Sequence, residues 1–396
     1  MRATEKKPDW IRTSEPGSFA ESTIKDRKPK ILQQVLLDNE YSPEIQKNIH
    51  DFVAEIKSGP VKPLYFPHSD IELWNRKLIK LAPSGWLDLP WFFAEVYFYR
   101  RLLEITGYYD EQSICYQKDP FGKQKMSQMM QDLEGMRGLS WLVEQDDAKA
   151  HFSALLHSAL WGNRADLSNI NIQLGHARDE MAGADHLVEI IDDTEAIFSF
   201  LQKQDTNLIY FLDNVGRELF SDLILIEYML RKSCDCKVTI VAKPAPFFVS
   251  DAMIGDVEVS IQMLMQSGDS VLQQIGSQLD ALVSSGQINT VTYPYLNGYQ
   301  MYCKMPTAFF NELLPYHLAV MKGDANYRRM VGDRHWPTTT ATVELLHYFP
   351  VPVVLLRTLK AELIVGLKPG EAEEIEAQSP DWLISGNYGL IQYIPK

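Results

Sequence analysis

The chain has 396 residues, of which 45% are hydrophobic and 11% aromatic, so it can bury a large core and has room for about two domains. Its formal net charge of −14 excludes a global positive field of the kind that draws proteins to nucleic acid or to an anionic membrane. Any phosphorylated partner must therefore meet a local positive site.

The cellular compartment is indicated by what the sequence lacks. No apolar run approaches the roughly 18 to 20 residues that span a bilayer, and the charged N-terminus has no apolar segment behind it. The four cysteines are few and scattered, which favours reduced thiols over a disulfide framework. We expect an intracellular, cytoplasmic protein, with the nucleus left open and with no membrane or nucleic-acid partner.

The first half of the chain has a helical texture. Apolar residues recur at helical spacing over about residues 45–201, most clearly over residues 91–105, and β-branched runs are nearly absent. We therefore predict a mostly helical N-terminal domain over residues 1–205.

The second half changes to short apolar strands separated by helical stretches. The predicted strands cover residues 208–212, 237–242, 290–293, 318–321 and 351–356, with helical stretches at 217–231 and 257–282. This alternation is typical of a largely parallel sheet with helices on both faces. The predicted class is α/β, with a Rossmann-like domain over residues 206–396.

Polar residues follow the predicted strands, where a ligand would lie in an open parallel sheet. The first strand runs into Asp213 and Asn214, with Gly216 and Glu218 close behind, and the second leads to Asp251. Two carboxylates and an amide oxygen form a hard oxygen set that suits Mg²⁺ or Mn²⁺. Asp213, Asn214 and Asp251 are the predicted metal ligands.

Cationic side chains cluster near two later strand ends and would bind a phosphate. They are Lys322, Arg328, Arg357 and Lys360. A bound metal would lower the pKa of a coordinated water, and Asp213 or Glu218 could accept its proton. Direct attack by water and covalent attack by Asp213 both remain open as mechanisms.

Structural roles are the alternative for each of these residues. Asp213, Asn214 and Asp251 could cap helices, and Arg357 and Lys360 could be solvated charges. The pattern alone leaves capping and a metal and phosphate site both open. The single glycine after the first strand, the lack of a Walker loop and the absence of HExxH argue against nucleotide-dependent and zinc-hydrolase chemistry.

At these same positions the sequence resembles the damage-control phosphatases, a metal-dependent family long catalogued as a domain of unknown function. The likeness is greatest to the subgroup named for an Arg-Thr-x-Lys motif, which stands here as Arg357-Thr358-Leu359-Lys360. The metal motifs match as Asp213-Asn214 and Ser250-Asp251, and the substrate loop as Lys322-Gly323-Asp324 and Asn326-Tyr327-Arg328. Further matches lie at residues 90–95, 99–101, 119–121, 161–163 and 166–168, so the resemblance covers nearly the whole chain.

The resemblance implies a helical N-terminal domain on a Rossmann-like phosphatase domain, with activity supported by Mn²⁺, Mg²⁺, Ni²⁺ or Co²⁺. It implies small phosphorylated metabolites as substrates, fructose 1-phosphate and fructose 6-phosphate among them, and a role in limiting reactive phosphometabolites. By position, the implied substrate contacts are Asp213, Asn214, Asp324, Asn326, Tyr327, Arg328 and Lys360.

Members of the family have also been described as S-adenosylmethionine-dependent carboxyl methyltransferases acting on protein glutamate, which gives a second candidate function. The metal-binding pattern favours the phosphatase, because a methyltransferase would be expected to carry a glycine-rich cofactor loop. A noncatalytic scaffold is the third candidate and predicts no metal dependence.

Overall fold

The structure is a computed structural model that describes residues 7–137, 147–162, 187–203, 206–231 and 236–396. Asn163 and the motif at residues 166–168 lie outside these residues. No helix in the described ranges combines the length and the apolar character that crossing a membrane requires.

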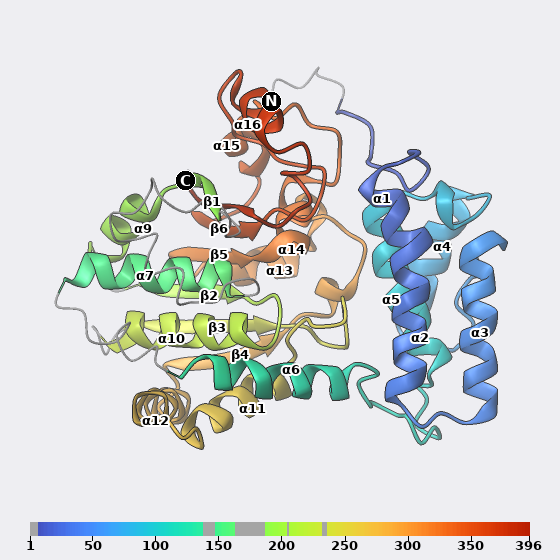
Figure 1. Ribbon diagram of the computed structural model, residues 1–396, viewed down its shortest axis with the longest axis horizontal. Helices are drawn as coiled ribbons and strands as arrows, with labels where there is room; N and C mark the ends of the chain where they lie inside the picture. Colours follow the sequence, from blue (N-terminus) through green and yellow to red (C-terminus); the bar gives the residue numbers. More distant parts are fainter. Residues whose placement is uncertain (1–6, 138–146, 163–186, 204–205, 232–235) are drawn as a thin grey trace.

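The N-terminal part is helical. Its elements are α1 (Phe19–Ser22), the π-helix η1 (Thr23–Arg27), α2 (Lys28–Asp38), α3 (Pro43–Ser58), α4 (Ile71–Leu81), the 3₁₀-helix η2 (Trp86–Asp88), α5 (Trp91–Ile105), α6 (Gly122–Gly135) and α7 (Ala148–Trp161). Every residue of α5 is buried, which matches a helix that is apolar on all sides. Figure 1 shows α2 to α5 standing beside the sheet as a separate helical layer with its own core.

The second part is built on a seven-stranded sheet in the order β1-β7-β6-β5-β2-β3-β4. The strands are β1 (Val188–Asp192), β2 (Asn207–Phe211), β3 (Lys237–Ala242), β4 (Ile288–Thr292), β5 (Leu318–Lys322), β6 (Val353–Thr358) and β7 (Tyr388–Ile394). Five neighbouring pairs are parallel, and only β6 with β7 is antiparallel. The predicted α/β class with a largely parallel sheet is confirmed.

Helices cover both faces of this sheet. They are α9 (Thr194–Leu201), α10 (Arg217–Arg231), α11 (Ile254–Met265), α12 (Ser270–Ser284), η4 (Pro294–Asn297), η5 (Tyr302–Lys304), α13 (Thr307–Leu313), α14 (Gly323–Val331), α15 (Thr342–Leu346) and α16 (Glu371–Gln378). Alternate residues of one strand enter different cores: Leu208 and Tyr210 of β2 join the core under α7 and α10, while Ile209 and Phe211 join the core under α14. Burial on both faces explains the continuous apolar runs of the strands.

Two details differ from the sequence-based expectations. The stretch expected to be helical over residues 257–282 is two helices, because the Asp269 side chain accepts hydrogen bonds from Val271 N and Leu272 N and so starts α12. The sheet also uses elements that precede residue 205, since β1 pairs with β7 and α7 packs against α10. The domain boundary between residues 205 and 206 stays a prediction.

Candidate active site

The carboxyl ends of β2 and β3 bring two segments of the chain together. Asn214 and Asp251 form an isolated antiparallel bridge, and Ala252 N donates to Asp213 O at 2.8 Å. Val215 N donates to Ser250 O at 2.7 Å. These main-chain bonds hold Asp251 beside Asp213 and Asn214, so the three predicted ligands share one place in the fold.

The third segment at this place is the first turn of α14, which begins at Gly323 directly after β5. Gly323 has φ +84°, and a Cβ built on it would lie 2.0 Å from Asp213 Oδ2. Only glycine therefore lets the Asp213 carboxylate lie against the N-terminus of α14.

The Asn214 side chain is fixed by three hydrogen bonds. Its Nδ2 donates to Asp213 Oδ2 at 2.7 Å and to Glu218 Oε2 at 3.0 Å, and its Oδ1 accepts from Ser250 Oγ at 2.6 Å. The amide oxygen retains a second lone pair for a cation. Asn214 is thus oriented before any ligand binds.

Acidic groups crowd this place, and the pKa values of Asp213 and Asp251 are raised there. Burial raises the pKa of Asp213 well above its ordinary value, and the nearby Glu218 and Asp251 carboxylates raise it further, whereas Lys243 and Lys360 lower it. Burial also raises the pKa of Asp251, although Lys243 Nζ lies 3.1 Å from Asp251 Oδ2 and opposes this shift. A bound cation would stabilise the ionised form of these buried carboxylates.

The donor set fits a hard divalent ion. Within the described ranges, no three His, Cys, Asp or Glu side chains converge as a metal-binding group. The predicted ligands are instead two carboxylates and one amide oxygen. This set still suits an ion such as Mg²⁺, which commonly binds only one or two carboxylates and completes its coordination shell with water and substrate oxygens. Asp213, Asn214 and Asp251 would supply these protein oxygens.

A cavity of about 150 Å³ opens onto these residues. Six predicted site residues line it: Asp213, Asn214, Asp251, Asp324, Arg328 and Lys360. The remaining predicted site residues do not line it: Glu218, Lys322, Asn326, Tyr327 and Arg357.

Lys322 is buried beneath the cavity, where it serves as a counter-ion. Its Nζ lies 3.2 Å from Glu218 Oε1 and 3.0 Å from Asp222 Oδ1, and it also donates to Ala159 O. Its charge is therefore engaged by two carboxylates. The predicted phosphate contact of Lys322 and the predicted catalytic role of Glu218 stay predictions.

Arg328 reaches the cavity while already held on several sides. Its guanidinium donates to Asp333 Oδ1 at 2.7 Å and to Glu95 Oε2 at 2.7 Å, and it lies 3.5 Å from the centroid of the Trp91 ring. Glu95 also accepts from Lys28 Nζ at 3.1 Å. This network joins α14 to α2 and α5, so the cavity lies where the helical layer meets the sheet domain.

Arg357 lies inside β6 and positions Asp324. Its Nε donates to Asp324 Oδ1 at 2.8 Å, its Nη1 donates to Leu363 O at 2.6 Å, and its guanidinium lies 4.1 Å from the centroid of the Tyr327 ring. Asn326 Nδ2 donates to Lys322 O at 2.8 Å. These side chains support the predicted substrate loop from below.

Several cavity residues escaped the sequence-based search. Phe19, Thr23, Arg27 and Phe248 line the cavity beside the predicted residues. Arg27 ends a π-helix, a feature that often marks functional sites, and its only signal in the sequence was a charged run at residues 25–30. Phe248 and its neighbour Val249 have φ of 44° and 70°, which is strained backbone for non-glycine residues. Such strain is characteristic of functional loops.

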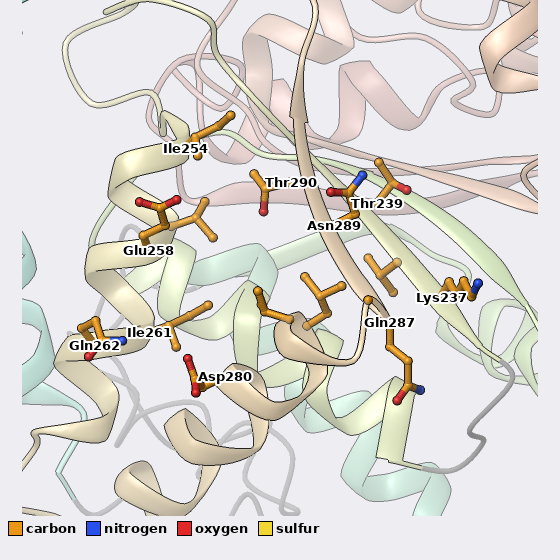
Figure 2. A pocket seen from close by; sticks show the side chains of 15 residues that line it. Lys237, Thr239, Ile254, Glu258, Ile261, Gln262, Asp280, Gln287, Asn289 and Thr290 are labelled. Atoms are coloured by element: carbon orange, nitrogen blue, oxygen red, sulfur yellow. The ribbon is translucent and has the colours of Figure 1, made fainter.

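A larger pocket of about 900 Å³ lies elsewhere, between α11, α12, β3 and the edge strand β4 (Figure 2). Its lining has the carboxylates Glu258 and Asp280 and one cation, Lys237. This charge balance suits a phosphate poorly, so the smaller cavity is the candidate active site.

Comparison with known proteins defines the class to which this fold and site belong. A family model described as "Damage-control phosphatase ARMT1-like domain" matches residues 23–375. The chain therefore belongs to the ARMT1-like damage-control phosphatase family. It is a phosphatase, and the family is metal-dependent.

Curated relatives match along nearly their whole length. Damage-control phosphatase ARMT1 of Xenopus tropicalis is 30% identical, over 95% of this chain and 96% of that protein. The human protein of the same name is 28% identical, over 98% of both chains. A crystal structure of a DUF89 family protein from Pyrococcus horikoshii superposes with a TM-score of 0.49 at 14% identity, covering 90% of this chain and 93% of that chain.

Proposed function

We propose that this chain hydrolyses phosphate monoesters of small metabolites, with fructose 1-phosphate and fructose 6-phosphate as substrates. The observation that carries the proposal is the cavity in which Asp213, Asn214 and Asp251 meet Arg27 and Lys360. Oxygen ligands for a divalent ion and cations for a phosphate occur together there. A phosphoryl group needs both, because its transfer depends on positioning and charge neutralisation.

We propose Asp213, Asn214 and Asp251 as the residues that hold Mn²⁺, Ni²⁺, Co²⁺ or Mg²⁺. When bound, such an ion neutralises charge on the phosphoryl oxygens and lowers the pKa of water. Glu218 accepts from Asn214 Nδ2 at 3.0 Å and so orients the amide oxygen. Glu218 acts on the site through Asn214, as a positioning residue.

The chain itself holds the phosphate between two positive features. Lys360 is half-buried at the cavity, and the N-terminal turn of α14 contributes Asp324 and Ala325 to the lining. The first backbone N–H groups of a helix have no partner inside the helix and bind anions. Arg328 lines the same side, but its charge is paired with Glu95 and Asp333, so it shapes the cavity rather than adding free positive charge.

Asp213 is placed to accept a proton or to attack. Burial raises its pKa well above the ordinary value in the metal-free chain, and the neighbouring carboxylates add to this, whereas a bound cation would oppose the shift and favour the carboxylate anion. Both routes put ¹⁸O from water into the released phosphate when water attacks phosphorus, so the two routes are separated by acid quench during a single turnover. A phosphoryl group found on Asp213 by mass spectrometry indicates a covalent intermediate, and its absence throughout the turnover indicates direct attack by water. Label in the Asp213 carboxylate would likewise contradict direct attack.

The test of the function is phosphate release from a panel of sugar phosphates and p-nitrophenyl phosphate. Each substrate is assayed with EDTA, Mg²⁺, Mn²⁺, Co²⁺ or Ni²⁺, for the wild type and for Asp251→Asn. Asp280→Asn is the matched control, because Asp280 is exposed and lies on α12, away from the cavity. We expect release that needs a metal and Asp251.

Absence of release from the wild type with every metal would refute the phosphatase proposal for this chain. The methyltransferase and scaffold alternatives would then be separated by calorimetric titration with S-adenosylmethionine. Binding of that cofactor would favour the methyltransferase, and its absence would favour the scaffold.

A further inference from the structure

A second hollow, a groove of about 580 Å³, adjoins the catalytic cavity. Four residues line both: Arg27, Asn214, Phe248 and Ser250. A ligand whose phosphate occupies the cavity would therefore have its remaining atoms at the groove entrance. The groove walls come from α2 and α6, together with the loop that follows β3.

The charge of the groove is one-sided. Arg27 and Lys30 are exposed cations on its wall, and none of the described residues that line it has a carboxylate. Lys125 also lines it but is neutralised, since its Nζ lies 2.9 Å from both Asp119 Oδ2 and Asp256 Oδ2. A groove that excludes carboxylates is unexpected in a chain of net charge −14. Its local field favours an anion.

The uncharged part of the lining suits a hydroxylated ligand. Gln34, Gln124 and Gln128 are exposed glutamines on the groove wall. Gln34 Nε2 donates to Asp38 Oδ1 at 3.0 Å and Gln128 Nε2 donates to Asp132 Oδ1 at 2.9 Å, so these two amides offer their oxygens as acceptors for sugar hydroxyls. Gln34 belongs to the same helix as Lys30, whereas Gln124 and Gln128 belong to α6.

The size of the two hollows supports one continuous site. The cavity of about 150 Å³ is smaller than the roughly 300 to 1,000 Å³ of ordinary ligand pockets, whereas the groove of about 580 Å³ lies within that range. The cavity fits the reacting phosphoryl group. The rest of a metabolite then extends into the groove.

We propose that this groove is a second substrate subsite, in which Lys30, together with Arg27 at the junction of the groove and the cavity, binds a second anionic group of the phosphorylated metabolite. The two residues are separated by three positions on adjoining helical turns, so they lie on one face and can grip one phosphate or carboxylate together. This inference rests on the proposed function and narrows its substrate class to doubly anionic metabolites.

The test compares three probes that share a phosphate monoester: fructose 6-phosphate, fructose 1,6-bisphosphate and 6-phosphogluconate. We expect the Mn²⁺-loaded wild type to have a higher kcat/KM for the two doubly anionic probes. Lys30→Gln should lower that preference about tenfold, since a hydrogen bond to a charged group contributes about 1.5 kcal/mol or more. Arg27→Gln should lower the preference too and should also lower kcat/KM for all three probes, because Arg27 lines the cavity as well as the groove. If the variants lose the preference for fructose 1,6-bisphosphate alone, the second group is a phosphate. If they lose the preference for 6-phosphogluconate alone, it is a carboxylate.

Lys123→Gln is the matched control, because Lys123 is an exposed lysine of α6 that does not line the groove. An equal preference in the wild type, or one that the Arg27 and Lys30 variants leave unchanged, would overturn the inference while the phosphatase proposal stands. If the wild type hydrolyses none of the probes and releases no phosphate from the sugar phosphate panel with any metal, the proposed function fails. In that case the groove is tested by binding: the dissociation constants of the three intact probes are measured by calorimetry with Mn²⁺. The ratio of the constants for doubly and singly anionic probes is then compared between the wild type and the variants.

Discussion

Gly323 lies against the Asp213 carboxylate so closely that a Cβ at residue 323 would be 2.0 Å from Asp213 Oδ2 and 2.6 Å from Oδ1. The first turn of α14 and the end of β2 thus meet at atoms that belong to the proposed metal site. Any side chain at residue 323 must displace Asp213 or the helix.

We therefore expect Gly323→Ala to lower kcat for phosphate release about 10²-fold, the effect of a displacement of about 1 Å in a catalytic group. The measurement is steady-state turnover with saturating metal. Gly370→Ala is the matched control, because Gly370 has a similar φ of +88° and no atom within 4 Å of an added Cβ. The control should lose about 1 kcal/mol of stability from backbone strain and keep its turnover. Similar turnover losses in both variants would contradict the steric argument.

The proposed ligands should also bind metal in the absence of substrate. Because an ion that binds only the folded state stabilises it, Mn²⁺ at about 100 times its Kd should add about 2.7 kcal/mol to the free energy of unfolding. Thermal unfolding with Mn²⁺ and with EDTA measures this as a rise in Tm. Asp213→Asn and Asp251→Asn should lose most of the rise, and Asp280→Asn should retain it. A full rise in both site variants would place the ion elsewhere.

The part of the site that sequence reasoning located is the part that topology dictates. Parallel strands end at one edge of the sheet, so polar residues directly after β2 and β3 had to come together, and Asp213, Asn214 and Asp251 do line one cavity. The same reasoning placed the α/β class correctly. It missed β1 and β7, whose sequences are partly polar and lie at or next to one edge of the sheet.

The position of a residue at a strand end does not predict whether a cationic side chain points into the cavity or into the protein. Lys322 and Arg357 point into the protein, because buried carboxylates and carbonyls there need donors. Lys322 pairs with Asp222, which is distant in sequence, whereas Arg357 donates to Leu363 O, which is close in sequence but follows the strand.

Phe248 lies in the loop between β3 and Asp251, but nothing in an apolar residue there signals a site. Arg27 belongs to a segment with no strand-end signal, and it reaches the cavity because the helical layer packs against the sheet domain. Tertiary packing alone brings it there.

A substitution of Lys322 distinguishes its role as a buried counter-ion from the predicted role as a substrate contact. Lys322→Met removes the counter-ion of Glu218 and Asp222, so we expect a loss of about 3 to 5 kcal/mol in the free energy of unfolding, measured with urea. Adding Asp222→Asn should restore part of this loss, because one uncompensated carboxylate is then removed. Near-normal stability combined with a raised KM would instead assign Lys322 to the substrate.

The buried ion pairs of Glu95 make the free energy of unfolding depend on pH. Burial alone would raise the pKa of Glu95, but Lys28 and Arg328 outweigh it and lower the pKa from 4.5 to about 2. As the pH falls below 4.5, the unfolded chain takes up this proton first, so the stabilisation present at higher pH is lost towards pH 2. The shift corresponds to a contribution on the order of 3 kcal/mol.

Glu95→Gln should therefore be less stable than the wild type at pH 6, and the difference should shrink as the pH falls to about 3, where the wild type begins to lose its ion pairs. Urea unfolding across this range measures both proteins. Glu72→Gln is the control, because the Glu72 side chain is 86% exposed and pairs only with the exposed Arg76 at 3.7 Å. A difference between Glu95→Gln and wild type that stays constant with pH would show that the carboxylate contributes by packing alone, since an electrostatic contribution has to follow its protonation.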